Sequence, residues 1–154
     1  MNMDSPELPD FSKWQSVNKD FTFFDYIYSS IKLKDLPPDF MLACLKLFWP
    51  DFFVENGCVF LKENFKREKY NRLVEQGLSQ RELEYWMNLL SLDGFFSNGR
   101  SNEFESFSIS KYLGKQLIPI WTSKLHLDFP KYVFMVKCVV DESEKEVFMV
   151  LKQM

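Results

Sequence analysis

A β-hairpin is predicted at the C-terminal end of this 154-residue chain, after a series of helical patterns. Residues 131–140 are rich in valine and aromatic side chains, and residues 146–152 repeat that composition after the polar segment 141–145. Two such runs separated by a polar segment are typical of a hairpin. The first run is apolar on both faces except at Lys137, so we expect it to lie inside a sheet.

Five segments before the hairpin are predicted to be helices, because apolar residues recur in them at helical spacing. Thr22 with Asp25, and Ser79 with Glu82, have the spacing of capping boxes, and Asn64 is expected to cap the third helix. A short apolar strand is predicted at 57–61. The predicted helices cover residues 23–33, 35–49, 65–76, 80–93 and 108–129.

These patterns together predict an α+β fold, in which about five helices pack on a small antiparallel sheet that includes the C-terminal hairpin. The length suits a single domain over residues 1–154. Residues 1–20 are acidic and contain two prolines, so we expect an irregular N-terminal arm held by Phe11 and Trp14. Residues 94–107 are expected to form a loop.

The apolar side chains are unusually large: the chain contains 17 Phe, 4 Trp and 6 Tyr, but a single alanine, Ala43. Trp86 and Trp121 fall on helical stripes and are predicted to lie in the core. Other rings fall where elements end, and there they either pack under loops or anchor a binding partner. These rings are Trp49, Phe52, Phe53, Phe95 and Phe96.

No catalytic, cofactor or metal-binding pattern is recognisable. His126 is the only histidine, which excludes a two-histidine zinc motif, and the five glycines form no phosphate-binding loop. Gly114 lies inside a predicted helix, where either close packing or a ligand near the backbone would require a glycine. We therefore predict a protein that is not an enzyme and holds no cofactor or metal.

Three cysteines without a CxxC spacing are expected to be free thiols in a reducing compartment. The N-terminus lacks the pattern of a signal peptide, and the longest apolar stretch is too interrupted to cross a bilayer. We therefore expect a cytoplasmic protein that does not bind membranes.

The charge distribution favours a basic protein partner. The net charge is −3, and residues 1–60 hold 5 basic and 9 acidic side chains, a net of −4, with 13 of the 27 aromatic residues. No dense basic cluster is present, which argues against nucleic-acid binding. Aromatic rings anchor interfaces and acidic side chains attract a basic partner, although surface acids beside a large core would give the same composition.

The leading hypothesis is a non-enzymatic interaction protein, in its concrete form an immunity or inhibitor protein that neutralises a basic partner such as a nuclease toxin. The alternative is a small-ligand-binding or enzymatic domain with an aromatic-lined pocket. The acids of the hairpin turn could also simply protect the end of the sheet from edge pairing. The partner-binding residues are predicted to be Trp49, Asp51, Phe53, Phe95, Phe96, Asp141, Glu142 and Glu144.

Overall fold

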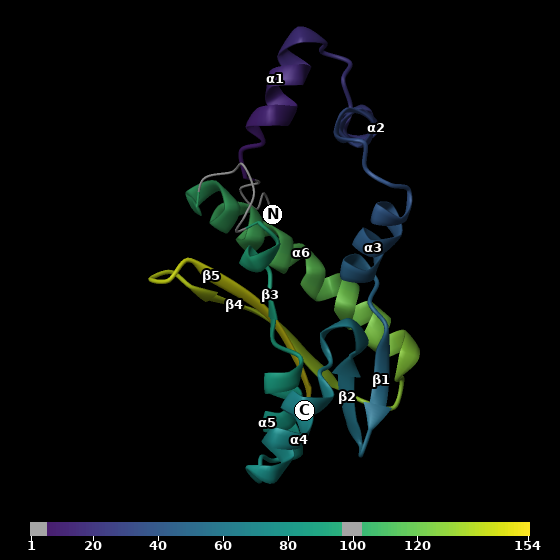
Figure 1. The fold of residues 1–154 in the computed structure, drawn as a ribbon, viewed down its shortest axis with the longest axis vertical. Coiled ribbons are helices and arrows are strands. Elements are labelled where there is room, and N and C mark those ends of the chain that lie inside the picture. Colours follow the sequence, from purple (N-terminus) through teal and green to yellow (C-terminus); the bar gives the residue numbers. More distant parts are fainter. Residues whose placement is uncertain (1–5, 97–102) are drawn as a thin grey trace. The chain divides into compact units, whose positions relative to one another are not determined.

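The computed structural model describes residues 6–96 and 103–154. The chain divides into two compact units, Met1–Cys44 and Leu45–Met154, which we treat separately. The first unit contains α1 (Pro9–Val17), α2 (Phe23–Lys34) and the beginning of α3 (Asp39–Phe48), labelled in Figure 1. A single domain over residues 1–154 stays a prediction.

Helix α1 corrects the expectation of an irregular arm over residues 9–17. Proline is compatible with the first turn of a helix because its missing N–H has no partner there, and Pro9 occupies that position. Phe11 then stacks on Phe23 with ring centroids 4.2 Å apart, and Trp14 stacks on Phe21. The prediction that Phe11 and Trp14 hold this segment is therefore confirmed, but the segment that they hold is helical.

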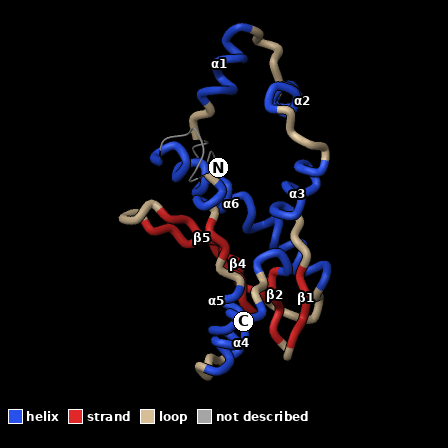
Figure 2. The backbone as a smooth tube through the Cα atoms, in the orientation of Figure 1, coloured by secondary structure: helices blue, strands red, loops and turns tan. Residues whose placement is uncertain are grey.

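Two antiparallel sheets lie in the second unit, in agreement with the predicted α+β class (Figure 2). Strand β1 (Phe52–Glu55) pairs with β2 (Cys58–Leu61) across the Asn56-Gly57 turn, where both residues have positive φ, as in the tight turns that hairpins favour. The second sheet has the order β3-β5-β4, formed by Leu90–Ser91, Glu146–Gln153 and Phe134–Asp141. The predicted C-terminal hairpin is thus confirmed.

The positions of the two hairpin strands differ from the expectation. Strand β5 is central and β4 lies at the edge, because β2 pairs with β1 instead of joining this sheet. The apolar side chains of β5 account for its central position, because burial on both faces removes them from water. Four of them are fully buried: Val147, Met149, Val150 and Leu151. The apolar composition of β4 comes from one face packed on α6 and another face that is partly exposed.

Helix α6 (Glu103–Asp128) supplies the other side of the main core. Leu117, Trp121 and Leu125 are fully buried against the sheet, while Pro119 stays inside the helix at an exposed position. The helix begins at Glu103, before the predicted start, so its first turn occupies part of the expected loop. Within that expected loop, residues 97–102 lie outside the described residues.

Helices α4 (Arg67–Glu75) and α5 (Gln80–Met87) enclose a smaller cluster of buried residues around Phe60. Helix α5 ends before its predicted limit, and the chain continues into β3 and the short 3₁₀ helix η2 (Asp93–Phe95). Asn64 does not cap α4. It lies in the 3₁₀ helix η1 (Lys62–Asn64), and its side-chain amide donates to the carbonyls of Met87 and Leu89.

Two buried polar side chains, Glu84 of α5 and Asn88 immediately after it, join the sheets. Glu84 accepts hydrogen bonds from the backbone N–H groups of Val59 in β2, at 2.7 Å, and Gln153 in β5, at 2.6 Å. The Gln153 side-chain amide donates to the same carboxylate.

Asn88, one turn after Glu84, completes this link. Its side chain accepts from the N–H of Leu61 and donates to the carbonyls of Val59 and Leu151. The outer edge of β2 and the end of β5 are therefore satisfied by side chains in place of a further strand.

Gly114 lies where α6 packs closely against Cys138 of β4 and Leu92. A Cβ atom at this position would overlap Cys138 Sγ and lie 3.2 Å from Leu92 Cδ1. Close packing, one of the two explanations considered for this glycine, is therefore what the structure shows.

We expect Gly114→Ala to lower the free energy of unfolding by about 1–2 kcal/mol, because overpacking outweighs the better helix propensity of alanine. Urea unfolding monitored by circular dichroism measures this change. The loss should shrink in a Cys138→Ala background, which removes the overlapping sulfur. Ser108→Ala, an exposed change on the same helix, is the control; an equal or higher stability of Gly114→Ala would contradict the packing argument.

Candidate functional site

The predicted partner-binding residues fall into two groups, and two residues of each group line a pocket of the second unit. Asp51 and Phe53 line a pocket of about 660 Å³ with Phe52, Lys62 and Phe65. The other group lies at the β4–β5 turn, where Phe96 and Glu144 share a second pocket. The fold therefore brings together Phe96 and Glu144, which are 48 residues apart in the sequence.

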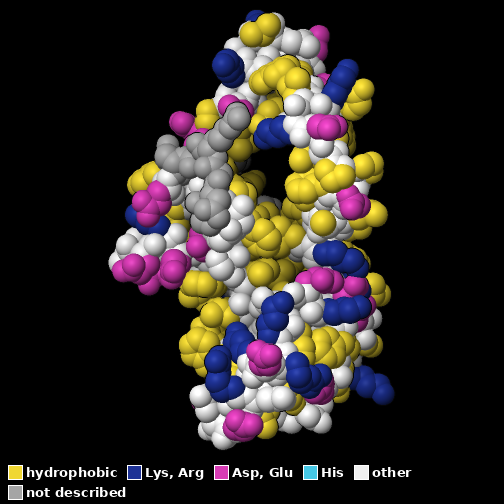
Figure 3. All heavy atoms as spheres, in the orientation of Figure 1, with side chains coloured by type: hydrophobic (Ala, Val, Ile, Leu, Met, Phe, Trp, Pro, Cys, Tyr) yellow, Lys and Arg dark blue, Asp and Glu magenta, His cyan; other side chains and the backbone are white. Residues whose placement is uncertain are grey.

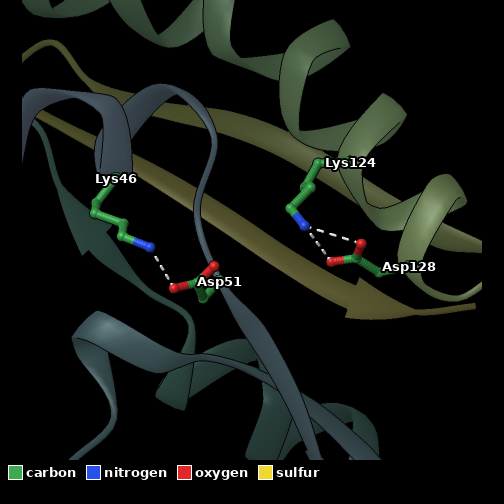
Figure 4. Close-up of polar contacts among 4 residues, drawn as sticks. All are labelled: Lys46, Asp51, Lys124 and Asp128. Carbon is green, nitrogen blue, oxygen red and sulfur yellow. Dashed lines mark hydrogen bonds and ion pairs between the residues drawn. The ribbon is translucent and has the colours of Figure 1, made fainter. Parts of the chain in front are cut away.

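The first group is already engaged within the chain. Lys46 pairs with Asp51, and this hydrogen bond lowers the pKa of the Asp51 carboxyl and raises that of Lys46 (Figure 4). Trp49 remains 40% exposed, with Lys124 Nζ 5.6 Å from its ring centroid. Lys124 also pairs with Asp128 at 2.7 Å (Figure 4).

Phe53 and Phe52 are half-buried and contribute to the cores. Phe53 packs edge-on against Phe65 and also contacts Phe60, whereas Phe52 packs edge-on against Trp121. A ligand pocket lined by these rings, the alternative hypothesis, stays a prediction. A pocket on which His126 and Gly114 converged would favour that hypothesis, but His126 is exposed and Gly114 is buried twelve residues earlier, about 18 Å along the helix.

Acidic side chains gather at the β4–β5 turn (Figure 3). Asp141 organises this turn: its Oδ1 atom accepts from the Ser143 hydroxyl and from the backbone N–H groups of Ser143 and Glu144. All three bonds lower the pKa of Asp141, and the bond from the Ser143 hydroxyl has the largest effect. Glu142 pairs with Lys111 of α6 at 2.7 Å. Of the three predicted acids here, Glu144 is the one that lines a pocket.

The pocket at the turn, which we call the acidic pocket, has a volume of about 410 Å³. It combines carboxylates with aromatic rings and contains one lysine, Lys145, whose Nζ lies 5.1 Å from the Phe107 ring centroid. Within residues 6–96 and 103–154, no ion pair engages the carboxylates of Glu103, Glu144 or Glu146. The lining residues are Asp93, Phe96, Glu103, Ser106, Phe107, Glu144, Lys145 and Glu146.

Several lining residues were not predicted. Asp93 has a structural role as well, since its Oδ1 accepts from the N–H of Val147 at 2.9 Å, and no sequence motif signals that bond. Phe107 is buried beneath the pocket. Phe95, which was predicted beside Phe96, is 57% exposed and does not line this pocket.

The described part of the chain has no group of three or more His, Cys, Asp or Glu side chains arranged to hold a metal ion. It also has no helix with the length and hydropathy needed to cross a membrane. Cys44, Cys58 and Cys138 are free, and burial raises the pKa of the Cys58 thiol to about 11.

Comparison of the chain with family models, with curated proteins and with solved structures gave no match. Any function proposed for this chain therefore depends on its own pockets and surfaces.

Proposed function

We propose that this protein is a non-enzymatic interaction protein that binds a basic protein partner, and that the acidic pocket receives a lysine or arginine side chain of that partner. The observation that carries the proposal is the combination of four carboxylates with the rings of Phe96 and Phe107 in one pocket. Long basic side chains have an apolar stem and a charged head, so such a pocket suits both parts.

Lys145 already shows how a cation fits this environment. Its ammonium group lies 5.4 Å from the Phe104 ring centroid and 5.1 Å from that of Phe107, within the range of cation–π attraction. An arginine from a partner would add bidentate hydrogen bonds to a carboxylate, which lysine cannot form.

The biological role that we propose is inhibition of a cationic protein in the cytoplasm, as an immunity protein inhibits a nuclease toxin. The net charge of −3 supports attraction to such a partner and disfavours direct binding to nucleic acid. Trp49 and Phe95 are exposed rings that could extend the interface.

Reversing one charge of the acidic pocket should weaken partner binding. We expect Glu144→Lys to lower the affinity for the captured partner at least tenfold, because it replaces attraction by repulsion at the pocket. The partner is first captured from extracts of the native cells, and its affinity is then measured by calorimetry at two salt concentrations.

Glu75→Lys is the matched control, since it makes the same charge change at an exposed position of α4. An equal loss in both variants would indicate a general charge effect and would contradict a specific site. Failure to capture any partner, together with a neighbouring gene product that neither binds this protein nor is toxic, would overturn the proposed function.

A further inference from the structure

Among the described residues, no strand pairs with the outer edge of β4. Within the described residues β4 pairs with β5 alone, and its eight residues make it the longest strand at an edge of either sheet. In an antiparallel pair, every second residue directs its N–H and C=O groups toward the partner strand. The backbone N–H of Met154 donates to the carbonyl of Val133, which shows that the odd-numbered residues of β4 face β5. The N–H and C=O groups that point away from β5 are those of Phe134, Val136, Cys138 and Val140.

The second edges of β2 and β5 are closed, in contrast to the outer edge of β4. The second edge of β2 is bonded by Glu84 and Asn88, and the second edge of β5 is bonded by β3, Asp93 and the same two side chains. The exposed strand β1 has four residues, about half the length of β4. An open edge of eight residues is a template for another strand unless charges or prolines protect it.

We propose that β4 pairs with β4 of a second copy of this chain, in an antiparallel arrangement centred on Val139, so that two three-stranded sheets become one sheet of six strands. The side chains select this occupant and register. Val139 is exposed on the face away from α6 and would meet its own copy across the two-fold axis. This homodimer does not depend on the function proposed above.

Charge complementarity supports that register over its neighbours. Centred on Val139, the pairing places Lys137 opposite Asp141 of the second copy, twice by symmetry, and all four side chains are exposed on the same face. Centring on Lys137 would bring two lysines together, and centring on Cys138 would place Lys137 opposite Val139. The ladder also agrees, because Cys138 and Val140 would then form a hydrogen-bonded pair through their outward groups.

Engineered cysteines test the register. We expect Val139→Cys to form a disulfide-linked dimer on exposure to oxidised glutathione, because facing residues of a non-hydrogen-bonded pair come within reach of a disulfide. Lys137→Cys should not cross-link, because its copy would lie four residues, about 13 Å, away along the strand. Non-reducing electrophoresis measures both, and the unmodified chain gives the background from Cys44, Cys58 and Cys138.

Sedimentation equilibrium tests the dimer without a cross-link. The unmodified protein should have twice the 18.5 kDa chain mass, and Val139→Lys should weaken association at least tenfold while circular dichroism stays unchanged. Val54→Lys, the same change at an exposed position of β1, should remain dimeric. A monomer at 100 µM would overturn the proposal, even if another protein were found to bind this edge. Cross-linking at position 137 instead of 139 would overturn the register.

Discussion

Replacing Glu84 with alanine is expected to lower the free energy of unfolding by about 3–5 kcal/mol, a large fraction of the stability of a small domain. The side chain is 1% exposed and accepts hydrogen bonds from β2 and from β5. Its loss leaves the N–H groups of Val59 and Gln153 without acceptors and opens a cavity between the sheets. Denaturant unfolding monitored by far-ultraviolet circular dichroism measures the change.

Two further variants make this test specific. Glu84→Gln keeps one acceptor oxygen, but its NH₂ group would face a backbone N–H group of β5 or β2, so that two donors meet. We therefore expect an intermediate loss of about 1–3 kcal/mol. Arg81→Ala, on an exposed position of the same helix, should change stability by about 0.5 kcal/mol or less. A loss below about 1 kcal/mol for Glu84→Ala would mean that water replaces the carboxylate and that it does not hold the sheets together.

Trp121→Ala should cause a similar loss, about 3–5 kcal/mol. Trp121 is fully buried at the centre of the main core, and its indole N–H donates to the carbonyl of Leu47 at 2.9 Å. Alanine removes the ring and also leaves that carbonyl at the end of α3 without its donor. Thermal and denaturant unfolding of the purified variants measure the effect.

The matched control is Trp86→Ala, because Trp86 is 47% exposed on α5 and should lose about 1 kcal/mol or less. Trp121→Phe separates the two contributions: it keeps the edge-on contact with Phe52 but lacks the indole donor, so about 1–2 kcal/mol should be lost. Equal losses for Trp86→Ala and Trp121→Ala would contradict the assignment of Trp121 to the core.

The elements that were predicted well carry local signals. Both capping boxes form as expected, with Thr22 accepting from the N–H of Asp25 and Ser79 from that of Glu82. The C-terminal hairpin and α2 also have nearly the predicted bounds. In each case the residues that decide the structure are close together in the chain.

The elements that were missed depend on distant residues. Trp86 was predicted to be buried, yet Glu84 and Asn88 occupy the inner face of α5, because strands more than 24 residues away need their hydrogen-bonding groups. For the same reason, the sequence pattern did not indicate that β5 would be central and β4 at the edge. Sheet order is decided by which backbone edges find partners.

The residues of the candidate site also divide into those that local sequence predicts and those that depend on distant residues. Phe96 and Glu144 were each predicted from local composition, and the fold alone brings them into one pocket. Asp93 was missed because its acceptor role toward Val147 exists only after β5 is in place. Trp49, Asp51 and Phe53 were predicted on the same grounds as Phe96, but intrachain cations and rings already contact them.

The central position of β5 also affects how the chain is made. On the ribosome, residues 45–145 emerge before the strand that α5, α6, β3 and β4 all contact. Until residues 146–153 follow, the buried faces of α6 and β4 and the carboxylate of Glu84 lack their partners. Folding of this unit therefore waits for residues 146–153, and a nascent chain that lacks them is a natural substrate for chaperones.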